Sequence, residues 1–578
     1  MSFLDWTIVI GLNGAVVVVG LVLARGVSSS REWFLAGRRL PWWLVGLSLY
    51  ATAIDSSDLV ADSGGTYELG FRYFVTGWVG TVAGWFVGAH WIFLPMYRAG
   101  LYTNAEYLEG RFGVAARVVS VLVQVQYRTL VLGIIGMALA LTLTVVCGWS
   151  DEKAWWVVAI VAVLAAAYTV SGGLRSVAVT DALQFVVMAV AAVVFWSLVW
   201  GKVGGWEGLV ARLGEADPRL PDELLHVGRD LSSAVPVDGK TPEEIARLCL
   251  LGGEHDEALQ AVVRRTPAWM VALGFGILGF AYSVVNHTQS MRLFGARSAW
   301  DLKMSAVVAS AALIVFTFFN LSMGVLGRAL HPLQELLPAG RQDTIYPLLV
   351  REFGGVGLTG LLVAGIFAAT LSTYDSISST LSALVTRDLY ARLFVRHKSD
   401  RHYLRVGRLV TPLIIALSFA YVPFLESGML DFYIHVTSAF VVPLLTLYLL
   451  GTFTRVHRHS GLWGLLAGGF YGVSRLLAPW AAERFGVRLL PPFLMDPYGA
   501  YLWSVLLTGG TMLLVTLVMG RDSGGLRPSS GGSQWLEASR LESCRPEDSA
   551  SEASGVVPLV LGAFFVALGC GLSFWVFW

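Results

Sequence analysis

The sequence predicts an all-α polytopic membrane protein with about fourteen transmembrane helices, two of which are interrupted. Of its 578 residues, 55% are hydrophobic and only 14% are charged, whereas about 25% are charged in soluble domains. Apolar runs of about 17 or more residues, which are long enough to cross a bilayer, recur along the chain. Polar clusters interrupt two of these runs, at 43–62 and 267–291. The composition therefore excludes a soluble globular core.

The predicted spans follow from these runs alone. In chain order they are 6–24, 43–62, 73–97, 118–147, 153–171, 177–200, 267–291, 302–328, 357–386, 408–426, 431–452, 462–479, 500–519 and 556–577. The first span has no basic leader or clean cleavage site, so we interpret it as a retained helix and not as a signal peptide.

Loop charges predict the orientation of the chain. The loops at 25–39, 387–408 and 455–459 are rich in arginine, and an even number of spans places all three on one side. The segment 201–266 falls on the other side and holds twelve Asp/Glu against eight Lys/Arg. The positive-inside rule therefore predicts an even number of spans with both termini outside. We expect the membrane to be a bacterial-type plasma (inner) membrane.

The span at 357–386 carries polar residues on one helical face. Ser372, Asp375, Ser379 and Ser382 follow the spacing i, i+3, i+7, i+10. A carboxylate near the bilayer centre costs roughly 2.5–3.5 kcal/mol, which a buried cation offsets. Oxygen ligands on one face indicate half of a site for a hard cation. The alternative is that these small residues only allow helices to pack closely.

The span at 43–62 contains four consecutive polar residues, Asp55, Ser56, Ser57 and Asp58. They cannot all face one helix seam, and Asp and Ser compete for backbone hydrogen bonds. We therefore predict a broken helix whose freed carbonyls face protein, water or an ion. A kinked packing helix, with Asp55 paired to an arginine, is the alternative.

The span at 267–291 repeats this pattern five spans later. Its glycine-rich first half leads into four polar residues, Tyr282, Ser283, Asn286 and His287. Interrupted helices at matching positions of two halves indicate an inverted-repeat transporter with a site near the bilayer midplane. We interpret His287 as structural in preference to a proton carrier.

Other residues narrow the function class. The chain has no His-Glu-x-x-His motif and no nucleophile elbow, so we predict no enzyme activity. Its net charge of +1 gives no sign of nucleic-acid binding. The four cysteines lack metal-ligand spacing, although pairing of Cys147 with Cys249 stays open. Asp181, at the start of the sixth span, is either a helix cap or a second cation ligand.

Several motifs together resemble the sodium:solute symporter family. They are residues 34–43 (FLAGRRLPWW), 168–184 (from YTVSGGLRS to Thr180, Asp181 and Gln184), 102–112, 286–298 and 369–390, and they occur in the family's order between about residue 5 and residue 455. The double glycine at 172–173 alone would be weak evidence for this resemblance, whereas the whole set of motifs is highly specific.

The resemblance implies a LeuT-type core of five plus five inverted helices. It divides the chain into an N-terminal helix and inner loop (1–42), a first repeat (43–200), an external insertion (201–266) and a second repeat (267–455). Accessory helices (456–520), a disordered inner linker (521–554) and a C-terminal helix (555–578) follow. We expect short helices in the insertion, including one that starts at Thr241.

The resemblance also implies sodium-coupled uptake of a small organic solute, such as a sugar or an amino acid, by alternating access. Its implied ligands for sodium, the co-transported ion, are the carbonyls of Ala51, Ile54 and Ala369 and the hydroxyls of Ser372 and Thr373. A second ion site is implied at Asp181, Ser372, Asp375 and Ser376. The expected solute-binding residues are Asp55, Ser57, Asp58, Tyr282, Ser283 and His287, with Tyr282 matching an inner-gate tyrosine.

The solute and the coupling ion are the parts of this interpretation with alternatives. Sugar-type members carry a glutamine at the position of Asp58, so Asp58 is a candidate partner for an amine on the solute. A proton-driven carrier using Asp55, Asp375 and His287, and a transporter-like membrane sensor, are the competing hypotheses. A homo-oligomer and a small accessory subunit stay open as partners.

Overall fold

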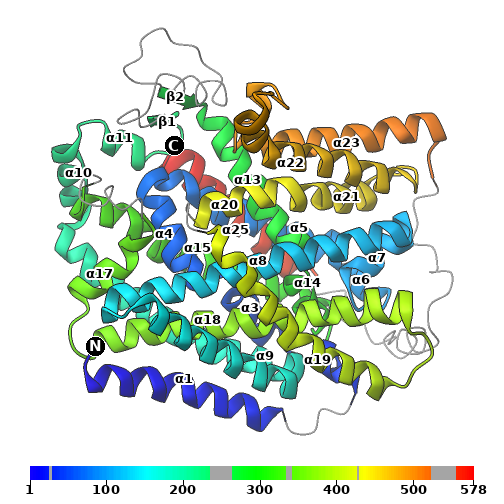
Figure 1. Cartoon of the computed structure of the whole chain (residues 1–578), viewed down its shortest axis with the longest axis horizontal. Coiled ribbons are helices and arrows are strands. Elements are labelled where there is room, and N and C mark those ends of the chain that lie inside the picture. The colour runs from blue at the N-terminus through cyan, green and yellow to red at the C-terminus, as the bar shows by residue number, and fades with distance from the viewer. Residues whose placement is uncertain (25–28, 235–262, 333–341, 426–428, 523–554) are drawn as a thin grey trace.

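The computed structural model describes residues 1–24, 29–234, 263–332, 342–425, 429–522 and 555–578. Within these residues it is almost entirely helical (Figure 1). Eleven of the described helices are long and apolar enough to cross a membrane, or twelve if the bent pair at 42–73 is one span.

The fourteen predicted ranges all contain helix, but the count of fourteen spans is not confirmed. The described helices at 460–485 and before residue 172 fall outside the set that meets the length and composition test. The count therefore stays a prediction.

The first half contains α1 and the first repeat. In order, the helices are α1 (Phe3–Leu23), α2 (Ser30–Leu35), α3 (Trp42–Ala51), α4 (Ser56–Leu69), the π-helical η3 (Thr76–Thr81), α5 (Val82–Val87), α6 (Phe93–Arg98), α7 (Asn104–Phe112), α8 (Val114–Cys147) and α9 (Asp151–Val203). Gly173 bends α9 at a φ of 62°, where a Cβ would lie 2.7 Å from Trp33. The predicted fifth and sixth spans are therefore two helices that meet at the non-helical Gly173, within the range labelled α9.

The second half contains the second repeat and the accessory helices. In order, they are α13 (Ala268–Val285), α14 (His287–Phe294), α15 (Ala299–Leu330), η6 (Gln342–Thr344), α17 (Ile345–Phe353), α18 (Leu358–Ala383), η7 (Leu384–Phe394), α19 (Asp400–Ser418), α20 (Met429–Val436), α21 (Val442–Phe453), α22 (Ser460–Phe485), α23 (Gly499–Met519) and α25 (Val556–Gly571).

Both predicted helix breaks are present. The helices α3 and α4 meet at 55° across four residues, and Asp55 between them is extended, with φ −126° and ψ −173°. In the second repeat, α13 ends at Val285 and Asn286 has a non-helical ψ of 110° before α14 begins. The glycines in α13 do not cause this break, because the helix continues through Gly274, Gly276 and Gly279.

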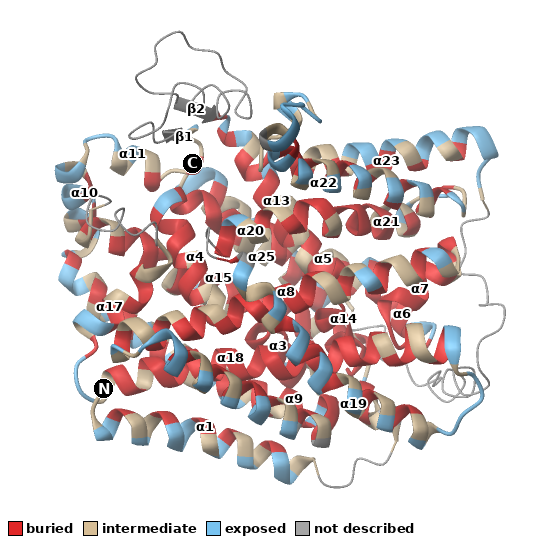
Figure 2. Cartoon of the chain, viewed as in Figure 1, coloured by how far each residue is buried: buried red, intermediate tan, exposed pale blue. Residues whose placement is uncertain are grey.

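The long helices lie side by side and run across the view in Figure 1. Both chain ends, α10 (Gly205–Ala216), α11 (Leu220–Leu224) and α17 lie toward the left of that view, whereas α6 and α7 lie at the right. Figure 2 shows α18 buried along nearly its whole length, while α1 and α23 present exposed stripes. The polar helix predicted to form half of a cation site is thus enclosed by protein and does not face lipid.

The insertion differs in part from the expectation of short helices. Besides α10 and α11 it holds an antiparallel pair of strands, β1 (Leu231–Ala234) and β2 (Val263–Thr266). The helix predicted at Thr241, the Cys147–Cys249 pairing and nearly all of the linker at 521–554 lie outside the described residues. Cys147 carries a free thiol whose Sγ is 3.3 Å from the Sδ of Met1.

Candidate ion and solute site

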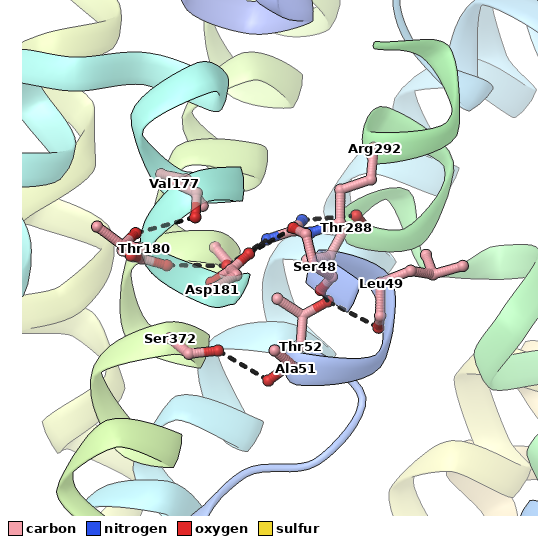
Figure 3. A network of polar contacts seen from close by, with 12 residues as sticks. Ser48, Leu49, Ala51, Thr52, Val177, Thr180, Asp181, Thr288, Arg292 and Ser372 are labelled. Atoms are coloured by element: carbon pink, nitrogen blue, oxygen red, sulfur yellow. Dashed lines mark hydrogen bonds and ion pairs between the residues drawn. The ribbon is translucent and has the colours of Figure 1, made fainter. Parts of the chain in front are cut away.

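The break between α3 and α4 meets α18 at the position predicted for sodium. The Ser372 hydroxyl donates to the carbonyl of Ala51 at 2.7 Å (Figure 3). That carbonyl has no helical donor, since the amide of Ile54 bonds to Tyr50 and the amide of Asp55 bonds to a side chain. Two elements more than 300 residues apart in sequence therefore present oxygen atoms to each other.

Thr373 adds an unsatisfied oxygen next to this contact. Its side chain is fully buried, and its Oγ1 has no hydrogen-bond partner among the described residues. Ala369, one turn earlier on α18, is also fully buried, and Ile54 lies within the break. A buried hydroxyl without a partner is destabilising unless a ligand satisfies it. These oxygen atoms fit a small hard cation.

The local sequence explains why the helix restarts at Ser56. Asp55 is the N-cap of α4, and its Oδ1 accepts from the amide of Ser57 at 2.8 Å and from the Ser57 hydroxyl. Asp58 Oδ2 accepts from the amide of Asp55 at 2.5 Å. This reciprocal capping box satisfies the first amides of the helix, so part of the acidic character at 55–58 is structural.

The residues of the implied second ion site surround a guanidinium group. Arg292 Nη2 lies 3.1 Å from Asp181 Oδ2 and also donates to the Ser376 hydroxyl. Its Nε donates to Ser48 at 2.9 Å, and Ser48 donates to Asp181 at 2.5 Å (Figure 3). Asp181 is thus a buried ion-pair partner and not the helix cap that composition alone favours.

Asp375 lies beside this cluster. Its Oδ1 accepts from the Ser376 hydroxyl at 2.8 Å, and both side chains are fully buried. The structure therefore brings Asp181, Asp375 and Ser376 together, with Arg292 between them as a tethered cation. Sequence reasoning missed this role, although Arg292 stands in one of the motifs that carry the family resemblance.

A cavity of about 110 Å³ lies beside the helix break. That volume is below the roughly 300–1,000 Å³ of pockets that enclose drug-sized ligands, so it suits a small solute. Of the predicted solute residues, the cavity is lined by Asp55, Ser57, Asp58 and Tyr282. Other polar lining residues are Asp62, Tyr73, Thr76, Thr81, Arg128, Thr317, Asn320 and Tyr433.

Ser283 and His287 do not line the cavity, so their predicted place at the solute site needs correction. The Ser283 hydroxyl donates to the carbonyls of Thr81 and Gly279, which joins α13 to its neighbour. His287 Nδ1 lies 2.8 Å from the Ser290 hydroxyl, within α14. Ser283 is turned away because the face of α13 that carries Tyr282 is the one that meets the cavity, and His287 lies beyond the break, on α14.

Two charged lining residues escaped the sequence analysis. Arg128 lies within the apolar α8, and Asp62 continues on α4 the face that carries Asp55 and Asp58. A charge inside a predicted span is the same signal that identified Asp375, so Arg128 was detectable. Asp62 follows Asp58 by four residues, which is helical spacing, and was detectable once the second limb was recognised as a helix.

The end of the molecule that carries α7 is closed by hydrogen bonds and ion pairs. Tyr282 donates to the carbonyl of Thr52 at 2.9 Å, and Gln289 donates to the Tyr282 hydroxyl at 3.1 Å. Farther along, a buried ion-pair network joins α7, α8 and η7. Its members are Glu106, Glu109, Arg117, Arg387, Asp388 and Arg392.

Glu109 shows how strongly this network is held. Burial raises its pKa, but hydrogen bonds and charge from Arg392 and Arg117 outweigh burial, so the pKa lies below its usual value. The Arg392 Nη2 to Glu109 Oε1 distance is 2.7 Å and the Arg117 Nη1 to Glu109 Oε2 distance is 2.5 Å. Three carboxylates balance three guanidinium groups, which permits their common burial.

The opposite end of the cavity has an apolar cover. Leu321, Met429 and Leu430 line it there, and the amide of Met429 donates to Asp343 Oδ2 at 3.3 Å. Asp343 also lies against Gly64, where an added Cβ would be 2.5 Å from Asp343 Oδ1. This confinement raises the pKa of Asp343 to about 6. The hydrogen bond from Met429 to Asp343 therefore ties η6 to α20 across the cover.

Comparison with known proteins adds family information to this geometry. The model of the family described as "Sodium:solute symporter family" matches residues 33–468. The chain is 29% identical over 543 residues to sodium/glucose cotransporter 4 of Danio rerio, covering 87% of this chain and 78% of that protein. It is 28% identical over 472 residues to a sodium/mannose cotransporter of Bos taurus, covering 77% and 74%.

A solved structure shares the fold. The substrate-bound outward-open state of a Na⁺-coupled sialic acid symporter superimposes with a TM-score of 0.70 over 91% of this chain and 100% of that chain, at 19% identity. At that identity the likeness concerns the fold alone. It supports the five-plus-five arrangement of interrupted helices expected from the sequence.

Proposed function

The chain belongs to the sodium:solute symporter family, and from that premise we propose where it binds its sodium ion and its solute. Sodium would be held at the junction of α3, α4 and α18, by the carbonyls of Ala51, Ile54 and Ala369 and by two hydroxyls. The observation that carries this assignment is the Ser372–Ala51 contact beside the unsatisfied, buried Thr373 hydroxyl.

The solute would occupy the cavity beside Ser57, Asp58 and Tyr282. Residues 53–55, 57 and 58 contribute to the cavity lining and include Ile54, which is also an implied sodium ligand. Sodium binding would therefore fix the break and order the cavity, which makes the two bindings mutually favourable. Loss of sodium to the cell interior would loosen the same break and release the Tyr282–Thr52 contact.

The driving force is adequate for accumulation. One sodium ion that enters through 100 mV releases roughly 2.3 kcal/mol, and a tenfold gradient adds about 1.4 kcal/mol. The sum supports roughly 400-fold accumulation of a neutral solute. This coupling works because both ligands favour one conformation over the other.

The charge distribution supports the proposed orientation. The chain ends and the described helices of the insertion, α10 and α11, lie at one end of the helices, while α7 and the arginine-rich η7 lie at the other. By the positive-inside rule the second end would face the cytoplasm of a bacterial-type cell. Both termini would then be outside.

Sodium-dependent stabilisation tests the ion site. Purified protein is heated in sodium chloride or in choline chloride at equal ionic strength, since a ligand that binds the native state raises the Tm by mass action. Sodium should raise the Tm of the wild type. Thr373→Ala should shift the half-maximal sodium concentration upward by about tenfold, which corresponds to about 1.4 kcal/mol, and Thr373→Ser should restore it.

An equal response of the wild type and Thr373→Ala to sodium would contradict the site. The coupling ion is then tested by measuring solute uptake into proteoliposomes. Uptake is compared under an imposed sodium gradient, under a proton gradient and with neither gradient. The family assignment favours sodium over the proton-driven carrier and over the membrane sensor. Uptake driven by the proton gradient alone would reverse that preference.

A further inference from the structure

The cavity has an unusual charge pattern for a site that binds a neutral solute. Its charged lining residues are three carboxylates, Asp55, Asp58 and Asp62, and one guanidinium, Arg128. The other lining groups are neutral hydroxyls, an amide and apolar side chains. A charged group in the interior of a membrane protein is energetically unfavourable, and one that is not fully paired indicates a functional site. The partners of each charged lining residue therefore show whether its role is structural or functional.

Capping accounts for only part of the acidic side. Asp55 and Asp58 each use an oxygen to cap α4. Asp62 has no such role, and its Oδ1 accepts from the Tyr73 hydroxyl at 2.9 Å. Because Asp55, Asp58 and Asp62 are spaced three and four residues apart, they share one helix face. Asp58 and Asp62 lie within hydrogen-bonding reach of each other, so these two carboxyl groups share a proton unless a cation compensates their charge.

The guanidinium group of Arg128 is a second feature of the cavity, independent of the carboxylates, that points to a ligand. Its side chain is 98% buried, being only 2% exposed, and it lines the cavity from α8. Its Nη1 makes only a 3.5 Å contact to the Tyr127 hydroxyl. Its Nε and Nη2 have no hydrogen-bond partner among the described residues. Guanidinium donors of this kind recognise carboxylates in a forked geometry.

A purely structural role explains this arrangement poorly. If Arg128 only neutralised the acidic wall, it would bond to a carboxylate, yet among the described residues its single hydrogen bond goes to Tyr127. One guanidinium also balances only one of three carboxylates. The cavity therefore offers an acceptor-rich wall and a donor group, and its lining also includes the apolar side chains of Val131, Leu278 and Leu313.

We infer that the solute is a small amino carboxylate, with its ammonium group at Asp58 and Asp62 and its carboxylate at Arg128. This inference rests on the proposed function, since it assigns the chemistry of the same cavity. A neutral sugar satisfies neither charge, a simple amine leaves Arg128 without a partner, and a simple acid leaves the acidic wall unbalanced. Each of these solutes should bind more weakly than a molecule that carries both groups.

A matched series of small molecules tests the inference on the purified full-length chain. Thermal shifts are measured in sodium chloride and in choline chloride with alanine, β-alanine and γ-aminobutyrate, which vary the distance between the two charges. Butylamine and butyrate each carry one charge of γ-aminobutyrate, and D-glucose and D-mannose carry none. At least one amino carboxylate should raise the Tm in sodium, with an apparent affinity at least tenfold above that of butylamine and butyrate.

Variants assign each end of the solute. Arg128→Gln should weaken binding of the amino carboxylate by tenfold or more while leaving butylamine unchanged, and Arg128→Lys should recover part of the loss. Asp62→Asn should weaken binding of the amino carboxylate and of butylamine while leaving butyrate unchanged. Arg475→Gln removes a similarly buried guanidinium of the accessory helix α22, which donates to Ser438 at 2.8 Å and is not part of the cavity lining, and should leave the preferences unchanged.

The two proposals fail in different ways. A sodium-dependent shift with D-glucose or D-mannose and with no amino carboxylate would overturn the inference and leave the sodium symporter intact. No shift with any amino carboxylate in sodium, or unchanged selectivity in Arg128→Gln, would also overturn it. A shift with an amino carboxylate that is identical in choline would support the solute class and contradict the proposed sodium coupling.

Discussion

Arg292 shows at the scale of a single residue how a predicted ion site changes when a side chain enters it. The sequence placed Asp181, Asp375 and Ser376 around a second cation. In the structure the guanidinium of Arg292 contacts Asp181 and Ser376. A buried ion pair of this kind adds little net free energy to folding, but removal of one partner is strongly destabilising because the other charge is left buried and unpaired.

Removal of Arg292 should therefore be strongly destabilising. We predict that Arg292→Gln lowers the free energy of unfolding by about 3–5 kcal/mol, because Asp181 is left buried and uncompensated. The double variant Arg292→Gln/Asp181→Asn should recover most of this loss. Denaturation of the purified single and double variants measures the coupling, and strictly additive effects would contradict the pairing.

Asp343 gives a pH-dependent prediction at the same scale. Its pKa of about 6 lies above its usual 3.8 because of burial, so ionisation of Asp343 destabilises the folded state above pH 6. Asp343→Asn should raise the Tm at pH 7.5, and the gain should shrink as the pH falls through 6. Asp217→Asn alters an exposed carboxylate paired with Arg219 and should show no such gain. A gain that is constant with pH would contradict the assignment.

The contact between α13 and η3 illustrates how glycine acts at the scale of elements. A Cβ at Gly279 would lie 2.0 Å from the carbonyl oxygen of Thr76. Gly276, three residues earlier on the same helix, has no atom within 4 Å of an added Cβ. Gly279 therefore allows the two repeats to approach closely.

These two glycines form a matched pair for a test. Gly279→Ala should lower the free energy of unfolding by about 1–3 kcal/mol, since the clash with backbone forces the helices apart. Gly276→Ala should leave the stability unchanged or raise it by up to about 1 kcal/mol through helix propensity. Thermal unfolding of both variants decides this, and equal effects would contradict the packing argument.

At the scale of the whole molecule, we expect the ion-pair network at the α7 end to hold that end closed. It connects elements from both repeats, and nearly all of its charges are buried. Since Glu109 has a lowered pKa, its stabilising contribution is present above its usual pKa of 4.5 and is lost as the pH falls through the lower, folded-state value.

Glu109→Gln should weaken this closure. Arg392 and Arg117 each lose a charged partner, so we predict faster amide hydrogen exchange in α7 and around Asn286, together with a lower Tm at pH 7. The wild type should approach the behaviour of the variant as the pH falls below 4.5. Glu207→Gln, an exposed change on α10, is the control and should leave the exchange rates unchanged. If Glu109→Gln exchanges at the same rates as the wild type, the role of the network in closure is contradicted.

Much of the fold was predictable because hydropathy and helix-breaking residues are local properties. The runs of apolar residues located every long helix, and the polar cluster at Asp55–Asp58 located the first break. The number of spans was less accessible, because two helical stretches do not meet the length and composition test for a membrane span. The face of α13 that carries Ser283 was also misassigned, since periodicity alone does not reveal which face meets the cavity.

The sequence by itself determined the class of protein, the two interruptions and the polar face of α18, because each follows from residues close together in the chain. Only the tertiary structure decided which oxygen atoms meet, that Arg292 enters the second cluster and that Arg128 shares a cavity with Asp62. These pairings join residues tens to hundreds of positions apart. Their energies depend on burial and mutual orientation, which the packing of the two repeats creates and no local pattern records.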